Sequence, residues 1–311
     1  MISYENLSKY ERKFLAMTGY RVIEFASLLE QFRAEFEAYV TEYCLDGTKR
    51  QKRKYVEYKN SPLPTIADKL LFILVYLKQG SLQEEHATLF KMHQPDANRW
   101  IHLLHQLLNQ ALAKLGELPA RTMADLAKHF AQEKDLAQLN LFLHDGTERA
   151  IVRPKDTELQ KLYYSGKKKV HTLKNLLLIN ALCKIIFLSA TEEGKKHDKK
   201  VADEAQYTLP QDSLLYQDTG FQGFSVTGVV IVQPKKKPRG KELTNEDKEN
   251  NQQISQVRIR IEHAIGGVKR YRIVKDKLRN WRKGFRDQVM ETCCGLHNFR
   301  LNFRPWHYDP L

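Results

Sequence analysis

Three acidic residues stand where divalent-metal chemistry could use them. Asp145 follows the apolar segment 140–144. Asp218 follows the segment 213–217, and Glu262 lies within a long stretch of helical pattern. Carboxylates at strand ends meet at one rim of an open α/β sheet, and a helix packed across the sheet can bring a third to that rim. Because clustered carboxylates repel one another, we expect them to hold Mg²⁺ or Mn²⁺, which prefer oxygen ligands.

Each acid has an ordinary alternative interpretation when it is taken alone. Asp145-Gly146 is a common turn sequence, and a glutamate within a helix is usually a solvated surface residue. Asp218 is followed by Gly220 and Gly223, which let the backbone turn sharply behind a strand. This turn favours a site at Asp218 over a simple surface position.

Two cations share the predicted helix with Glu262. Arg258 precedes it by four residues and Lys269 follows it by seven, so helical spacing puts both on its side. Arg258 could be a surface ion pair, which would contribute little to stability. The functional alternative is that Arg258 orients Glu262 and that Lys269 contacts a phosphate.

Short apolar segments must position these acids. Residues 140–144 predict a strand that ends at the turn sequence 145–147, with 150–152 as its hairpin partner. Further strands are predicted over 172–181, 183–190, 213–217 and 229–232, a helix over 201–207, and long helices over 244–277 and 285–301. Strands mixed with helices predict an α/β domain.

A different pattern precedes this domain. Residues 65–112 predict three helices, with Thr65 as the first N-cap, Gly80 as its stop and a tight turn at 91–93 before the third. This order is typical of a helix-turn-helix, although an ordinary three-helix bundle has the same pattern. In the DNA-binding interpretation, the recognition helix begins with Gln94, Asp96, Asn98 and Arg99.

The first 60 residues predict a helix followed by a basic linker. Its apolar stripe comprises Val22, Phe25, Leu28, Leu29, Phe32 and Phe36. We therefore expect three parts: a helical N-terminal region over 1–60, a helix-turn-helix domain over 61–135 and a catalytic domain over 136–311.

Composition restricts the class of protein and its partners. The 311 residues include 51 lysines and arginines against 37 acids, a net charge of +14, and 42% are hydrophobic. This composition excludes a wholly disordered chain, and no apolar run approaches the ~20 residues that span a bilayer. The N-terminus lacks the features of a secretion signal, and none of the four cysteines forms a Cys-x-x-Cys pair. We expect a reducing, cytoplasmic setting.

Basic residues gather in four runs rather than being evenly spread. The runs cover 49–54, 167–169, 195–200 and 235–241. A single run is usually a solvated face, whereas four favour a surface that follows phosphates. Nucleic acid is therefore favoured over a membrane surface, and the charge argues against a glycosidase acting on neutral sugars.

The order of these motifs resembles the DDE superfamily of transposase endonucleases, specifically the Harbinger-like group that includes bacterial insertion-sequence transposases. The resemblance covers about residues 64–298, and the matching stretches are 145–148, 163–174, 196–198, 218–223, 235–240, 258–269 and 296–298. The lysines before His197-Asp198 depart from the family, which tends to have small or neutral residues there. Both residues are interpreted as structural, and residues 1–60 match no known pattern.

The resemblance implies an RNase H-like catalytic fold and metal-dependent cutting and joining of transposon ends. It makes Asp145, Asp218 and Glu262 the metal-binding triad, with two Mg²⁺ or Mn²⁺ ions for each active site. The expected DNA contacts are Gln94, Asn98, Arg99, Lys167, Lys169, His171, Lys174, Lys235, Lys236, Lys237, Arg239, Arg258 and Lys269. A plain basic hairpin is the alternative for 163–174.

The implied reaction is hydrolysis at the transposon end followed by attack of the released 3′-hydroxyl on target DNA, without a covalent protein intermediate. The partners would be double-stranded DNA of the terminal inverted repeats and of the target. The resemblance also implies a bacterial cytoplasmic protein that is associated with the nucleoid. Because two ends must be held together, a homodimer or larger assembly is expected. The alternative is a catalytically inactive transposase-derived regulator that binds DNA through its helix-turn-helix.

Overall fold

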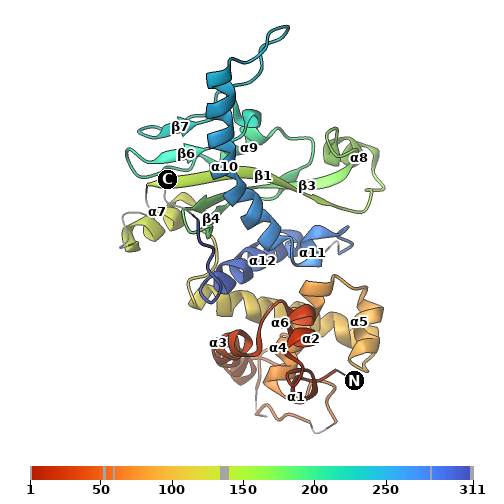
Figure 1. Cartoon of the computed structure of the whole chain (residues 1–311). Helices are drawn as coiled ribbons and strands as arrows, with labels where there is room; N and C mark the ends of the chain where they lie inside the picture. Colours follow the sequence, from red (N-terminus) through yellow and green to blue (C-terminus); the bar gives the residue numbers. More distant parts are fainter. Residues whose placement is uncertain (1, 52–53, 59, 134–139, 281, 309–311) are drawn as a thin grey trace. The chain divides into compact units, whose positions relative to one another are not determined.

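The computed structural model describes residues 2–308, except for 52–53, 59, 134–139 and 281 (Figure 1). Two compact units emerge, one comprising 1–118, 269–276 and 288–303, the other 119–268, 277–287 and 304–311. These units do not follow the three sequence segments, and the expected boundary near residue 135 lies outside the described residues. In the described part, no helix is long and apolar enough to cross a membrane.

The first unit is helical. Its helices are α1 (Tyr4–Leu7), α2 (Glu11–Thr18), α3 (Val22–Glu42), α4 (Ile66–Gln79), α5 (Gln83–Leu89), α6 (Gln94–Lys114), α11 (Arg272–Lys275) and most of α12 (Phe285–Leu301). The predicted stripe of α3 is buried at Phe25, Leu28, Phe32 and Phe36. Residues 67–77 of α4 are all buried, so α4 forms the centre of this unit.

The three helices predicted over 65–112 are confirmed as α4, α5 and α6. Thr65 caps α4 because its hydroxyl accepts a hydrogen bond from the Asp68 amide at 3.0 Å. Gly80 ends α4 with φ +62°, and a Cβ there would lie 3.0 Å from the Arg272 carbonyl carbon. Both the left-handed backbone and the close contact therefore require glycine. The helices α5 and α6, joined by a short turn, form the helix-turn-helix.

The second unit is built on a mixed sheet. Its strands are β1 (Leu141–Ala150), β2 (Tyr164–Ser165), β3 (Val170–Asn180), β4 (Ile185–Leu188), β5 (Glu192–Glu193), β6 (Leu214–Tyr216) and β7 (Val230–Val232). The order is β2-β3-β1-β6-β7, with β4 and β5 also paired to β3. Strand β1 is antiparallel to β3, whereas β1, β6 and β7 are parallel. The α/β class predicted from the sequence is confirmed.

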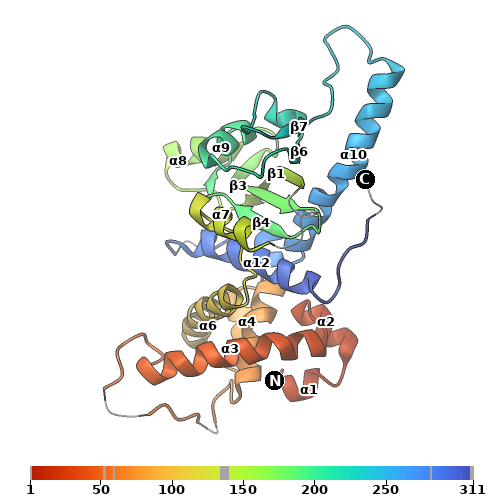
Figure 2. The same ribbon diagram turned by 90° about the vertical axis from the view of Figure 1, so that its left-hand side faces the viewer.

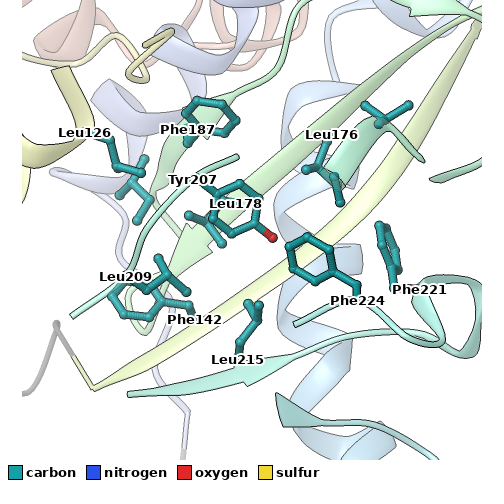
Figure 3. Packing of buried hydrophobic residues seen from close by; sticks show 13 residues of the cluster. Leu126, Phe142, Leu176, Leu178, Phe187, Tyr207, Leu209, Leu215, Phe221 and Phe224 are labelled. Atoms are coloured by element: carbon teal, nitrogen blue, oxygen red, sulfur yellow. The ribbon is translucent and has the colours of Figure 1, made fainter. Parts of the chain in front are cut away.

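Helices cover both faces of this sheet. The helices are α7 (Met123–Gln132), α8 (Thr157–Tyr163), α9 (Asp198–Ala205) and α10 (Asn245–Val268). Figure 2 shows α10 along one face and α9 on the other. Alternate residues of β1 face α9, and the core on this side is apolar and partly aromatic (Figure 3). Its members include Phe142, Leu176, Leu178, Val201, Tyr207, Leu215, Phe221 and Phe224.

The predicted hairpin between 140–144 and 150–152 is wrong. Residues 141–150 form one strand, paired with β3 without a break from Phe142 opposite Asn180 to Ala150 opposite Thr172. The sequence Asp145-Gly146-Thr147 therefore lies inside a strand rather than in a turn. The other predicted strands and helices of this part are present with bounds that differ by a few residues at most, except that the helix predicted over 244–277 ends at Val268.

Candidate active site

Asp145 and Asp218 occupy equivalent places on neighbouring parallel strands. The last pair of residues shared by β1 and β6 is Leu143 and Tyr216. Each aspartate lies two residues beyond that pair, so both come to the same rim of the sheet. Strand β6 stops there and its chain turns into the short helix Thr219–Phe221, whereas β1 continues beside β3.

The carboxylate of Asp145 lies in a partly desolvated and acidic environment. Burial raises its pKa to about 6, opposed by a hydrogen bond from the Gly146 amide and by the Arg258 guanidinium. The charges of Asp218 and Asp198 raise this pKa further. The three carboxylates therefore act on one another, and a cation among them would relieve the repulsion.

Backbone amides donate to one oxygen each of the Asp145 and Asp218 carboxylates. Asp145 Oδ1 accepts from the Gly146 amide at 2.7 Å, and Asp218 Oδ1 accepts from the Thr219 amide at 2.6 Å. Arg258 Nη1 lies 3.9 Å from the same Asp218 oxygen, and the Arg258 side chain is 12% exposed. Within the described residues, neither Oδ2 atom takes a hydrogen bond, so each carboxylate presents one oxygen to a ligand.

Asp198 belongs to this rim, although the sequence led us to treat it as structural. It begins α9, and its Oδ1 would lie 2.6 Å from a Cβ added to Gly146. Its Oδ2 lies 3.7 Å from the Cβ position of Gly220. Lys174 donates to Asp198 Oδ1 at 2.9 Å. The available signal was Gly146 directly after Asp145, because a side chain at position 146 would collide with the Asp198 carboxylate.

Glu262 lies on α10, one turn beyond Arg258, with an exposed side chain. Among the residues that the structure describes, no group of three or more His, Cys, Asp or Glu side chains is arranged to hold a metal ion. The structure therefore brings together Asp145, Asp218, Asp198 and Arg258, but it does not close a three-carboxylate cluster with Glu262.

The residues at the rim fit a divalent cation with oxygen ligands. Mg²⁺ usually keeps several waters and binds proteins through one or two carboxylates together with substrate phosphates. Asp145 and Asp218 supply two such carboxylates, each with its Oδ2 atom outside the hydrogen bonds described above. Mn²⁺ takes the same ligands.

The predicted DNA contacts at the β2–β3 turn differ in accessibility. Lys167 and Lys169 are exposed, and Lys169 has a left-handed backbone with φ +57°. His171 is half-buried, with its ring 5.7 Å from that of Tyr164. Lys174 is buried, and its ammonium donates to the Lys196 carbonyl at 2.6 Å besides its ion pair with Asp198. We therefore leave Lys174 out of the DNA interface proposed below.

The basic loop before α10 is partly neutralised. Lys235 contacts both carboxylate oxygens of Asp247 at 2.8 Å, and Lys237 pairs with Glu242. Lys236 and Arg239 are exposed in the same loop. Lys269, expected on the same helix as Glu262, follows the last residue of α10, so the argument from helical spacing does not apply to it.

The start of α6 carries the predicted recognition residues. Gln94 and Asn98 both donate to the side-chain oxygen of Gln83 on α5, at 2.7 and 3.0 Å. Arg99 pairs with Asp96, and its side chain is 69% exposed. Gln83 thus orients two amides on the helix that would enter a DNA groove, while Arg99 points to solvent.

These features define an α/β domain of the RNase H-like class, with aspartates on adjacent parallel strands, in a chain that also contains a helix-turn-helix. A family model described as DDE superfamily endonuclease matches residues 144–298. A second, described as helix-turn-helix of DDE superfamily endonuclease, matches residues 61–114. The chain belongs to the DDE superfamily of transposase endonucleases.

One curated relative supports this assignment over most of the chain. A probable transposase for insertion sequence element IS702 from Microchaete diplosiphon is 26% identical over 261 residues. The alignment covers 83% of this chain and 89% of the relative. No solved structure matches the chain.

Proposed function

We propose that this chain is a DNA transposase that cuts the ends of a mobile element and joins the released 3′-hydroxyl to target DNA. The observation that carries the proposal is the placement of Asp145 and Asp218 two residues beyond the last pair of adjacent parallel strands. The family matches and the transposase relative support the same activity.

In this proposal Asp145 and Asp218 hold divalent cations, and Glu262 is their third protein ligand. Glu262 is retained because one helical turn, about 5.4 Å, separates it from Arg258, which lies beside Asp218. Two bound Mg²⁺ ions supply Lewis acidity and a water of lowered pKa for phosphodiester hydrolysis. Arg258 offsets part of the negative charge of the carboxylates and orients Asp218.

DNA binding in this proposal uses exposed cations of both units. Arg99 and the amides of Gln94 and Asn98 would read a groove from the start of α6. Lys167, Lys169, His171, Lys236 and Arg239 would follow phosphates near the active site, with Lys235, Lys237 and Lys269 as further contacts. Holding two transposon ends calls for two copies of the chain, so we propose a homodimer or larger assembly on DNA.

An inactive DNA-binding regulator is the second candidate. It is favoured by the lack of a closed three-ligand cluster in the described residues. Such a protein would keep the helix-turn-helix and bind the same DNA without cutting it.

Cleavage of a plasmid that carries the element's own two ends separates these candidates. We expect the purified full chain to nick it in Mg²⁺, and Asp145→Asn and Asp218→Asn to lose nicking while keeping their affinity for the ends. Glu262→Gln should also lose nicking, whereas Glu249→Gln, an exposed residue on the same helix, should nick like the wild type. Equal nicking by the wild type and by Asp145→Asn would contradict the proposed enzymatic function. If the wild type bound DNA without nicking it, the result would favour the inactive regulator.

A further inference from the structure

The residues directly before Asp145 and Asp218 are hydrogen-bonded to each other. His144 precedes Asp145 on β1, and Gln217 precedes Asp218 after β6. The ring nitrogen Nε2 of His144 lies 3.1 Å from Gln217 Oε1. His144 is 0% exposed and Gln217 is 1% exposed, so this bond is inside the core of the unit.

A third segment reaches the same imidazole. The hydroxyl of Tyr207 bonds to Nδ1 of His144, and Tyr207 follows α9, which begins with Asp198. Since the Gln217 oxygen can only accept, Nε2 of His144 donates to it. One buried histidine therefore bonds to residues from both of the other segments that carry aspartates of the site.

Aromatic side chains surround the His144 ring, so few other hydrogen-bond partners are available to it. The ring of His144 lies 4.1 Å from that of Phe221 and 5.2 Å from that of Phe224, measured between centroids. Gln217 also donates to the Phe221 carbonyl at 3.4 Å, which ties the turn after Asp218 to the same network. Breaking one of these buried bonds leaves an unpaired polar atom and is costly.

Strand β6 is short. It has three residues, and its pairing with β1 and its pairing with β7 each span three residue pairs. A slip of one residue would move Asp218 by about 3.3 Å and turn its side chain to the other face. A side-chain bond at the end of the pairing fixes the register at the point where the two aspartates follow.

We propose that His144 is a positioning residue, which sets the spacing of Asp145, Asp218 and Asp198 through its bonds to Gln217 and Tyr207. This inference rests on the proposed function, because it assigns to His144 the alignment of that same metal-binding rim. Residues that orient metal ligands typically change metal affinity or activity 10–100-fold when they are replaced.

The test measures metal binding as well as activity. Mn²⁺ affinity of the full chain is measured by isothermal titration calorimetry, and the half-saturating Mn²⁺ concentration by nicking of the plasmid with the element's ends. We expect Tyr207→Phe and His144→Phe to weaken both about 10–100-fold, with unchanged affinity for DNA. His144→Asn, whose amide oxygen can accept the Tyr207 proton, should recover part of the loss.

A matched control separates positioning from general stability. Phe187→Leu replaces an aromatic ring, whose centroid lies 5.7 Å from that of the Tyr207 ring, by a smaller apolar side chain. It leaves the hydrogen bonds of His144 in place. It should lower the melting temperature without changing Mn²⁺ affinity. Tyr207→Phe keeps the test valid if His144→Phe does not fold, since it removes one oxygen atom.

Failure of this inference is distinguishable from failure of the proposed function. Asp145→Asn should bind Mn²⁺ far more weakly than the wild type. If it does, and Tyr207→Phe and His144→Phe bind Mn²⁺ like the wild type, His144 has no positioning role and the proposed function stands. If the wild type neither binds Mn²⁺ nor nicks, the proposed function fails and the inference fails with it.

Discussion

The surroundings of the Asp145 carboxylate make its ionised form costly to the stability of the fold. Its carboxylate is partly buried beside two other acids, and these surroundings raise its pKa from 3.8 to about 6. The folded protein therefore binds this proton more tightly than the unfolded chain does, so stability falls as pH rises from about 4 to about 6. A divalent cation at the rim would offset that cost, because it binds only the folded state.

Replacing this carboxylate should stabilise the metal-free protein. Asp145→Asn removes the negative charge. A pKa change of roughly two units corresponds to about 3 kcal/mol at most. Because the group is partly solvated, we expect the free energy of unfolding at pH 7 to rise by about 2 kcal/mol. Urea unfolding in a chelator measures it. The gain should nearly vanish at pH 4, where the wild-type carboxylate is largely protonated in the folded state, and equal stability at pH 7 would refute it.

Lys174 shows how a basic residue can be structural. Its side chain is 8% exposed, and it lies between Asp198 at 2.9 Å and Glu148 at 3.8 Å. Lys174→Met leaves these acids without their cation, and breaking a buried pair in this way costs about 3 kcal/mol. We expect a lower free energy of unfolding and an unchanged salt dependence of DNA binding. Lys167→Met, at an exposed position, should leave the free energy of unfolding unchanged and reduce the salt dependence of DNA binding.

The place of Asp218 could be predicted from the sequence because β6 ends just before it. Asp145 was also expected to follow a strand, but it lies inside β1. It reaches the same rim because the pairing of β1 with β6 ends at Leu143. Asp198 and Lys174 could not be placed in this way, since their roles depend on how α9 packs over Gly146 and on which face of β3 is covered. Such packing depends on residues far away in the sequence.

At the scale of elements, Gly146 explains why a turn was predicted where a strand runs. Asp-Gly is a strong turn signal, but a glycine inside a strand can also mark a place where another group comes close. Here that group is Asp198, whose Oδ1 would lie 2.6 Å from an added Cβ. The continuous pairing of β1 with β3 then overrides the local preference.

A single methyl group added at position 146 should lower the stability of the protein. Gly146→Ala should destabilise the protein by about 1–3 kcal/mol, because the new Cβ displaces the Asp198 carboxylate. Gly166→Ala is the matched control, since nothing lies within 4 Å of its Cβ position and its stability should change little. Thermal unfolding measures both. In an Asp198→Ala background the added cost of Gly146→Ala should shrink, and an equal cost there would show that the contact is not the cause.

The bounds of α4 were predicted closely from the sequence. Thr65 caps its start by bonding to Asp68, and Gly80 ends it with a left-handed backbone, so both signals lie within the local sequence. The burial of α4 on every side was not evident from its pattern, because α2, α3, α6 and α11 all pack against it.

At the scale of the whole molecule, the C-terminal segments explain why compact units and sequence segments differ. Tyr20 donates to the Leu296 carbonyl at 2.7 Å, and Asn298 donates to the Glu117 carbonyl at 2.9 Å. Helix α12 therefore completes the core of the helical unit, although the sequence places it at the end of the catalytic segment. Partners separated by 276 and 181 residues cannot be paired by periodicity alone.

The net charge of +14 can attract DNA in two ways, and the salt dependence of binding distinguishes them. A general field depends on total charge, whereas contacts with phosphates depend on where the cations are. Replacing Lys167, Lys169, Lys236 and Arg239 by alanine should lower the slope of log affinity against log salt by about 3–4, since each phosphate contact contributes about 0.9.

The matched control replaces four exposed cations outside the proposed interface, Lys9, Arg12, Lys13 and Lys128, with the same change in net charge. Its slope should stay close to that of the wild type. Equal losses of slope in the two variants would assign binding to total charge and remove the β2–β3 turn and the loop before α10 from the DNA interface.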